Sequence, residues 1–114
     1  MIPSGTRVVL AAAPVDFRKG PASLMALVRD AGEDPLSGAL YVFRSRRADR
    51  VKIVWWDGSG VCLFAKTLDE GAFRWPRIGE GVMRLHSAQL LALVDGMDWA
   101  RVRATRVRQP VSLG

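Results

Sequence analysis

The sequence is poor in the residues that build metal centres and nucleophilic active sites. Its 114 residues include one cysteine, Cys62, and one histidine, His86. A single cysteine excludes a disulfide within the chain and a thiolate cage for zinc, because both need several cysteines. Cys62 lies between Val61 and Leu63 in an apolar run. We therefore expect a buried, inert thiol, and a structural histidine in the loop before a helix.

Acidic residues are few and scattered. There are 11 aspartates and glutamates against 17 lysines and arginines, which gives a net charge of +6. A metal-dependent nuclease needs clustered carboxylates to hold Mg²⁺. Asp16 and Asp57 are the pair we consider for such a site, and a small nuclease that uses them is the third of three hypotheses. The sequence predicts no enzyme, no cofactor and no metal site.

Long hydrophobic runs are also missing. No apolar stretch approaches the roughly 20 residues that span a bilayer. The amino-terminal apolar segment is short and has Arg7 within it, which is unlike a signal peptide. We expect Arg7–Ala13 to form a strand, and we expect a cytoplasmic protein with no membrane partner.

The sequence does contain a dense β-forming stretch from Leu40 to Leu68. Three runs rich in Val, Ile, Tyr, Phe and Trp are separated by polar breaks at Ser45–Arg50 and Asp57–Gly60. The glycines of the second break allow positive φ, so the chain can reverse within a few residues. These features predict three consecutive antiparallel strands. The expected strands are Leu40–Arg44, Val51–Trp56 and Val61–Thr67.

Two helices accompany this meander. Apolar residues recur at helical spacing in Pro21–Ala31 and Ser87–Met97, and Ser87 is expected to cap the second helix. Short strands are expected at Ala72–Trp75 and Val82–Leu85. The predicted fold class is α+β, a small antiparallel β-meander sheet with two amphipathic helices. The length fits one domain over residues 1–100, followed by a basic, flexible tail over residues 101–114.

Positive charge concentrates on the first hairpin and its strand ends. A small domain of this charge attracts polyanions through counterion release. Trp55 and Trp56 follow the basic residues, and a basic hairpin with nearby aromatics is typical of a nucleic-acid platform. The alternative is a solvated loop with core tryptophans, since strand alternation sends one of the pair inward. The basic residues of this hairpin are Arg44, Arg46, Arg47, Arg50 and Lys52.

Two further basic groups flank the meander. Arg18 and Lys19 come just before the first helix, whose amino end favours an anion such as a phosphate. The other interpretation is a local cap or ion pair between Asp16 and these residues, and both stay open. The tail carries no acid and can stay mobile until it meets a polyanion, or serve as a solubilising terminus. Its basic residues are Arg101, Arg103, Arg106 and Arg108.

Several short motifs follow one another in a specific order. They are DFRKG at 16–20, DPLSG at 34–38, VFRSRR at 42–47, Lys52 with WWDG at 55–58, LFAK at 63–66 and FRWP at 73–76. Their order and spacing resemble the TnpB (Orf2-like) accessory protein of the insertion-sequence group numbered sixty-six, from about Thr6 to Trp99. The resemblance implies a role in DNA transposition beside a separate, larger transposase that carries the catalysis. It supplies no catalytic residues.

The leading hypothesis is a non-catalytic accessory factor of transposition that binds DNA through the basic hairpin. Its arginines and Lys52 would contact phosphates, Arg18 and Lys19 would form a second contact, and Trp55 or Trp56 would stack on a base. The expected partners are insertion-sequence DNA ends and the transposase, and a homo-oligomer is left open. The second hypothesis is a protein-interaction module that docks on the transposase without DNA contact. An exposed apolar patch around Trp75 or Trp99 would favour it.

Overall fold

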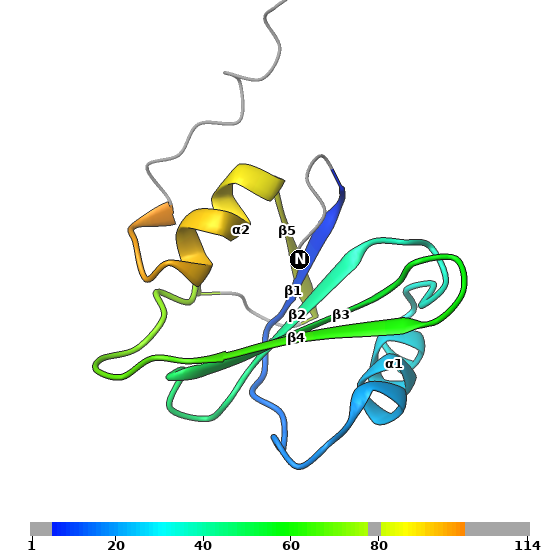
Figure 1. Ribbon diagram of the computed structural model, residues 1–114, viewed down its shortest axis with the longest axis horizontal. Helices are drawn as coiled ribbons and strands as arrows, with labels where there is room; N and C mark the ends of the chain where they lie inside the picture. Colours follow the sequence, from blue (N-terminus) through cyan, green and yellow to red (C-terminus); the bar gives the residue numbers. More distant parts are fainter. Residues whose placement is uncertain (1–5, 78–80, 100–114) are drawn as a thin grey trace, which may run out of the picture.

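The described part of the protein is a five-stranded sheet with one helix on each face (Figure 1). The computed structural model describes residues 6–77 and 81–99. This is an α+β architecture, as the sequence predicts. The elements in chain order are β1 (Val8–Ala11), α1 (Pro21–Asp30), β2 (Leu40–Arg44), β3 (Arg50–Trp56), β4 (Val61–Thr67), β5 (Val82–Leu85) and α2 (Ser87–Val94).

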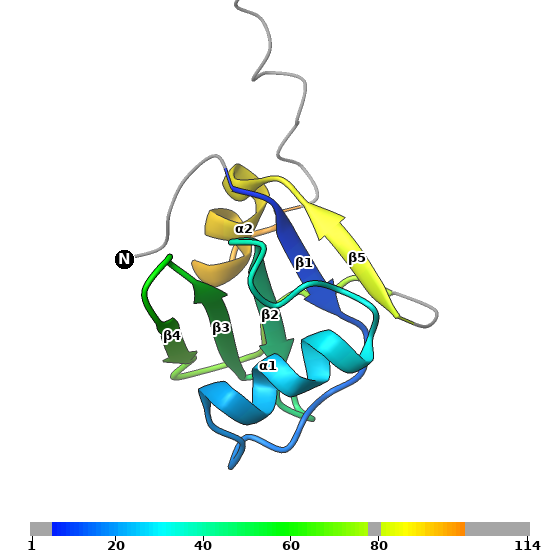
Figure 2. The ribbon, with the colours of Figure 1, turned by 90° about the vertical axis from the view of Figure 1, so that its right-hand side faces the viewer.

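The sheet is mixed, so the prediction of a purely antiparallel sheet is wrong. Its strand order is β4-β3-β2-β1-β5, with α1 in front of the sheet and α2 behind it in Figure 2. The predicted antiparallel meander is confirmed, with Val42 opposite Ile53 and Ile53 opposite Phe64. β1 is parallel to β2, however, with Val9 opposite Tyr41. The connection through α1 is long enough to return the chain to the end at which β1 began, which a parallel pair requires.

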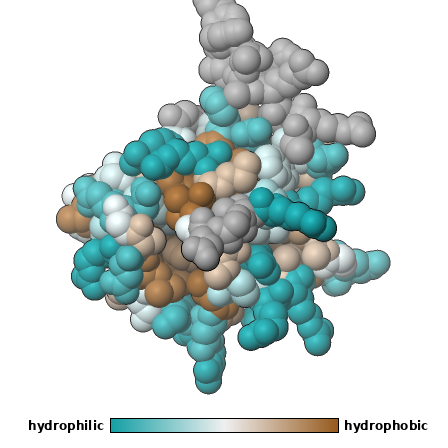
Figure 3. All heavy atoms as spheres, turned by 180° about the vertical axis from the view of Figure 1, so that it is seen from behind, coloured by the Kyte–Doolittle hydropathy of each residue, from teal (hydrophilic) through white to brown (hydrophobic). Residues whose placement is uncertain are grey.

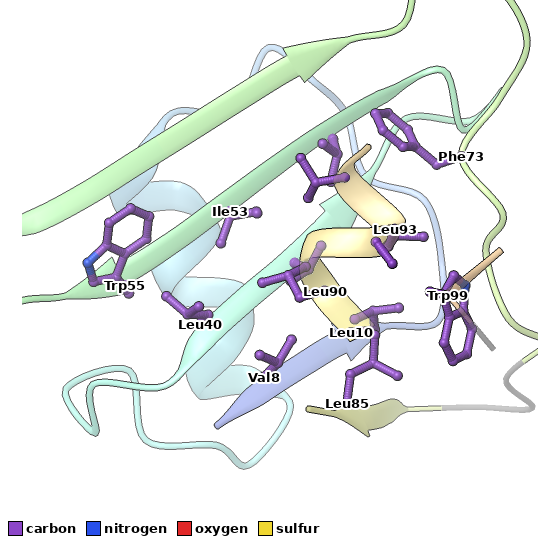
Figure 4. Packing of buried hydrophobic residues seen from close by; sticks show 14 residues of the cluster. Val8, Leu10, Leu40, Ile53, Trp55, Phe73, Leu85, Leu90, Leu93 and Trp99 are labelled. Carbon is purple, nitrogen blue, oxygen red and sulfur yellow. The ribbon is translucent and has the colours of Figure 1, made fainter. Parts of the chain in front are cut away.

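Strand alternation divides the apolar residues between the two faces. Successive side chains of β1, β2 and β3 point to opposite sides, and both sides are covered by a helix. These strands therefore contain nearly continuous buried runs. The cluster on the α2 side includes Val8, Leu10, Leu40, Val42, Val51, Ile53, Trp55, Phe73, Leu85, Leu90, Leu93 and Trp99 (Figure 4). The cluster on the α1 side consists of Val9, Leu24, Met25, Val28, Ala39, Tyr41, Phe43 and Val54.

Some element boundaries differ from the predicted ones. His86, not Ser87, is the N-cap of α2, because Gln89 three residues later accepts the His86 backbone N–H through Oε1 at 3.0 Å. The expected strand at Ala72–Trp75 is absent, and this described segment is irregular. There the Trp75 indole N–H donates to the Ala11 carbonyl at 3.0 Å. The segment is therefore attached to β1 by a side chain and not by backbone pairing between strands.

An apolar groove of about 610 Å³ lies on the α1 side of the sheet, beside β1 and β5. Figure 3 shows apolar side chains gathered near the middle of one side of the molecule, surrounded by hydrophilic ones. Charged residues at the rim of the groove include Asp16, Lys19 and Glu33. Its apolar lining includes Val9, Ala11, Val15, Leu27, Val28 and Val82.

Candidate nucleic-acid interface

The turn between β2 and β3 is held by a buried hydroxyl. Ser45 Oγ accepts the Arg50 backbone N–H at 3.1 Å and donates to Asp49 Oδ1 at 3.0 Å. The backbone N–H groups of Leu68 and Phe73 donate to the carbonyls of Asp49 and Ala48, at 2.8 and 2.7 Å. The turn backbone is therefore fixed from inside and from the side. None of these hydrogen bonds uses the side chain of Arg46, Arg47 or Arg50.

Three arginines point from this fixed turn into solvent. Arg46 and Arg47 are exposed in the turn itself, and Arg50 is exposed at the start of β3. Together they border a hollow of about 430 Å³ next to Ser45 and Asp49. Guanidinium groups in this setting keep their donors available for a planar acceptor such as a phosphate. The structure places these three arginines together and exposed, and their contact with DNA stays a prediction.

The segment before α1 joins the same surface. Arg18 shares a second hollow, of about 400 Å³, with Arg46 and Arg50, although nearly thirty residues separate them in the sequence. We call Arg18, Arg46, Arg47 and Arg50 the basic hairpin surface. The fold thus brings together two of the basic groups that the sequence shows as separate.

Arg18 is already paired. Its side chain is 91% exposed, and its Nη2 lies 2.7 Å from Asp16 Oδ2. The Arg18 backbone N–H also donates to Asp16 Oδ1 at 2.9 Å. Hydrogen bonds from the Arg18 side chain and backbone hold the pKa of Asp16 far below its usual range. The local ion pair is therefore present, and part of the Arg18 charge is neutralised by its neighbour.

Lys52 serves as an anchor for the loop before α1. Its ammonium donates to the carbonyls of Phe17 and Lys19, at 2.7 and 3.0 Å. Its Nζ also lies 5.0 Å from the centre of the Phe17 ring, and Arg50 Cζ lies 5.1 Å from the same ring. Lys52 holds the loop that carries Arg18 against β3. Its donors are engaged within the fold, so it positions the surface and is not a free cation.

Arg44 is also engaged within the fold. Its Nη1 donates to the carbonyl of Arg46 at 3.2 Å, and its Cζ lies 6.0 Å from the Trp75 ring centre. Its Nε is buried and has no hydrogen-bond partner among the described residues. Lys19 is half-buried at the rim of the apolar groove. Neither residue faces solvent as Arg46 and Arg47 do.

The two tryptophans lie away from the basic turn. β3 begins at Arg50 and ends at Trp56, so at about 3.3 Å per residue the pair lies roughly 17–20 Å along the strand. Trp55 is 7% exposed in the α2-side core, and Trp56 is half-buried against the α1-side cluster. The aromatic ring at the basic hairpin surface is Phe17. Sequence reasoning missed it, although it stands inside the DFRKG motif.

The two aspartates considered for a nuclease do not converge. Asp16 lies beside the β2–β3 turn, whereas Asp57 lies in the turn beyond the far end of β3. Asp57 Oδ1 accepts the backbone N–H groups of Ser59 and Gly60, each at 2.9 Å. These hydrogen bonds lower the pKa of Asp57. Within residues 6–77 and 81–99, no group of three or more His, Cys, Asp or Glu is placed to hold a metal ion.

An exposed apolar patch around Trp75 or Trp99 would favour the docking hypothesis, but neither tryptophan is itself exposed. Trp99 is buried, with its indole N–H bonded to the Arg74 carbonyl, and Trp75 is half-buried in the same cluster. None of the described helices is long and apolar enough to cross a membrane. The exposed large apolar side chains of the described residues are Leu36, Val61, Leu63, Leu91 and Met97. The tail residues Arg101, Arg103, Arg106 and Arg108 lie outside the described residues.

Comparison with known proteins gives one family and two curated relatives. The family model described as "IS66 Orf2 like protein" matches residues 6–104. The uncharacterized protein y4jC of Sinorhizobium fredii (strain NBRC 101917 / NGR234) is 40% identical over 96% of this chain and 94% of its own. The uncharacterized protein y4hO of the same strain is 42% identical over 92% of this chain and 94% of its own. No solved structure matches significantly.

Proposed function

We propose that this chain, which belongs to the IS66 Orf2-like family of insertion-sequence accessory proteins, binds DNA in transposition without catalysing a step. The basic hairpin surface would make the contact. The observation that carries the proposal is the gathering of Arg46, Arg47 and Arg50, with Arg18, around two adjoining hollows. The net charge of +6 supports the proposal, because a positively charged protein attracts a polyanion such as DNA.

The residues of the surface divide into contacts and supports. Arg46, Arg47 and Arg50 would bind phosphates directly, and Arg18 would add a contact that competes with Asp16. Lys52 and Arg44 would hold the loop and the turn in place, since their donors already bond to backbone carbonyls. The ring of Phe17 offers a face beside Arg50 for an unstacked base. The DNA bound would be the ends of the insertion sequence, and the protein partner would be the transposase.

A salt titration tests the contact. We expect the triple replacement of Arg46, Arg47 and Arg50 by Ala to weaken binding and to flatten the log–log salt dependence by about two to three units on duplex DNA. The loss should be similar for unrelated sequences, because phosphate contacts do not read bases. Single-stranded DNA and RNA of the same length belong in the same series.

The matched control removes the same charge elsewhere. Arg7, Arg29 and Arg84 are exposed and line neither hollow of the basic hairpin surface. Replacing these three by Ala lowers the net charge equally but should leave most of the salt slope in place. Equal losses in the two triple variants would mean that net charge alone drives binding. An unchanged slope in the hairpin variant would remove the basic hairpin surface from consideration.

A docking role on the transposase is the second candidate. The observation that favours it is the apolar groove of about 610 Å³ beside α1, β1 and β5. A groove of this size and composition suits an apolar segment of another protein. Replacing Ala11 in its lining by Asp should abolish co-purification with the transposase while DNA binding stays unchanged. Loss of DNA binding in this variant would instead link the two functions.

A further inference from the structure

The two edges of the sheet differ in how they are protected. β5 is only four residues long. Its exposed Arg84 forms an ion pair with Glu33, with 3.6 Å between Arg84 Nη2 and Glu33 Oε2. Short length and charge are common ways to keep an edge strand from pairing with another chain. β4 at the other edge is seven residues long and contains neither proline nor an acid. Its side chains Val61 and Leu63 are exposed.

The outer edge of β4, with which no described strand pairs, presents a defined set of backbone groups. Asp57 N–H bonds to the Gly60 carbonyl and Leu68 N–H to the Asp49 carbonyl, at the two ends of the β3–β4 ladder. Hydrogen-bonded pairs alternate along an antiparallel ladder, so the even-numbered residues of β4 bond to β3. The odd-numbered residues turn their N–H and C=O groups outward. These are Val61, Leu63, Ala65 and Thr67.

We propose that the β4 edge pairs with the β4 edge of a second copy of the chain, antiparallel and around a two-fold axis at Phe64. This register places Leu63 opposite Ala65 of the second copy and Val61 opposite Thr67. Every outward N–H and C=O of these four residues then forms a hydrogen bond with the second copy. Large side chains lie beside small ones, and the two Phe64 rings are neighbours, which is a favourable cross-strand pair.

The charges of β4 permit this pairing. Lys66 is the one charged residue of the strand, and it stands opposite Cys62 of the second copy and not opposite another cation. Its ammonium already donates to the Val94 carbonyl at 2.7 Å, so it sits inside its own fold. An inward lysine usually protects an edge because a new strand would strip its water. Here the protein supplies the acceptor, and the protection is lost.

The occupant is therefore a strand with the same pattern as β4 itself. A strand from an unrelated protein would need the same alternation of small and large residues, whereas a second copy brings it by symmetry. The result would be one continuous sheet of two chains. Because a two-fold axis of this kind is perpendicular to the sheet, both α1 helices would lie on one face and both α2 helices on the other.

Sedimentation equilibrium of the full chain tests the pairing. Over ~1 to ~300 µM we expect the mass to rise from the 12.5 kDa of one chain toward twice that value. Leu63→Lys should weaken the dimer at least tenfold, because it places a charge in the seam. Ala65→Pro should do the same by removing an outward N–H, a change that an edge strand tolerates without unfolding.

Leu91→Lys is the matched control. Leu91 is 47% exposed on α2 and Leu63 is 41% exposed on β4, so the same substitution is made at similar exposure. The dimer should survive it. A wild-type chain that remains monomeric throughout would overturn the proposal, as would a dimer unaffected by both edge variants. Neither result bears on DNA binding, which the arginine variants test separately.

Cross-linking tests the register. In a Cys62→Ser background, chains with Leu63→Cys mixed with chains carrying Ala65→Cys should form a disulfide between chains under mild oxidation. Opposed residues of a hydrogen-bonded pair have Cα atoms about 5.5 Å apart, within disulfide reach. Leu63→Cys mixed with Leu91→Cys should not react. Equal cross-linking in the two mixtures would overturn the register.

Discussion

In both turns of the β2–β3–β4 meander, a side-chain oxygen accepts hydrogen bonds from backbone N–H groups. The arginines of the first turn remain exposed, whereas the Asp57 carboxylate of the second turn is engaged. In the turn at residues 45–49, the hydroxyl of Ser45 binds the backbone, and the arginines remain in solvent. In the turn at residues 57–60, the carboxylate of Asp57 binds the backbone itself. A charged side chain that holds its own turn is not available to a partner. A charged side chain therefore stays available to a partner when another group accepts the hydrogen bonds of its turn.

Replacing the serine of each turn by alanine should give the largest difference between the two turns. Ser45 is 5% exposed, so Ser45→Ala leaves the Arg50 N–H and Asp49 without their partner inside the fold. We expect the free energy of unfolding to fall by about 1–3 kcal/mol. Ser59→Ala in the other turn removes an exposed hydroxyl and should change it by less than about 0.5 kcal/mol. Urea unfolding of both variants measures the difference, and equal effects would contradict it.

Each turn also contains one residue with positive φ, and the two residues should respond to substitution in opposite ways. Gly58 has φ 104° and Ala48 has φ 58°, so each turn places a residue where L side chains are strained. Gly58→Ala should destabilise the fold by about 1–2 kcal/mol. Ala48→Gly should stabilise it by up to about 1 kcal/mol, since relief of strain exceeds the added freedom of the unfolded chain. Thermal unfolding gives both values. Destabilisation by Ala48→Gly would show that Ala48 packs usefully in the turn.

The smallest effect is a pH dependence that belongs to the second turn. Hydrogen bonds from Ser59 and Gly60 lower the pKa of Asp57 in the fold. The ionised Asp57 carboxylate therefore stabilises the fold above the ordinary carboxyl pKa of about 4. This stabilisation is lost as pH falls through the pKa of Asp57 in the folded protein. We expect the urea midpoint of wild type to exceed that of Asp57→Asn at pH 7 and the gap to narrow toward pH 2. A gap independent of pH would show that the charge is irrelevant.

Much of the meander was predictable because its signals are local. β-branched and aromatic runs between Leu40 and Thr67, with glycines at Gly58 and Gly60, indicate strands and reversals without reference to the rest of the chain. The direction of β1 was not predictable in this way. It depends on where the connection through α1 returns the chain, and no residue of β1 encodes that.

The sequence showed which residues of the candidate site are charged, but not which of them form hydrogen bonds within the fold. Arg46 and Arg47 are exposed, as expected for side chains at the tip of a loop. Lys52 looked equivalent in the sequence, yet its acceptors are the carbonyls of Phe17 and Lys19, more than thirty residues earlier. Trp55 and Trp56 looked adjacent to the arginines, but an extended strand separates neighbours in sequence by several ångströms per residue. Their place beside Arg50 is taken by Phe17.

The position of β1 in the sheet has a consequence for the order of folding. β1 lies between β2 and β5, and Val8 pairs with Leu85 near the other end of the described chain. The meander closes through contacts between near neighbours, which form fast, whereas the β1–β5 pair must close a long loop. During synthesis from the amino end, β1 is made first but its outer edge stays open until β5 emerges. A strand that is translated well before β5 is thus among the last of the described strands to be completed.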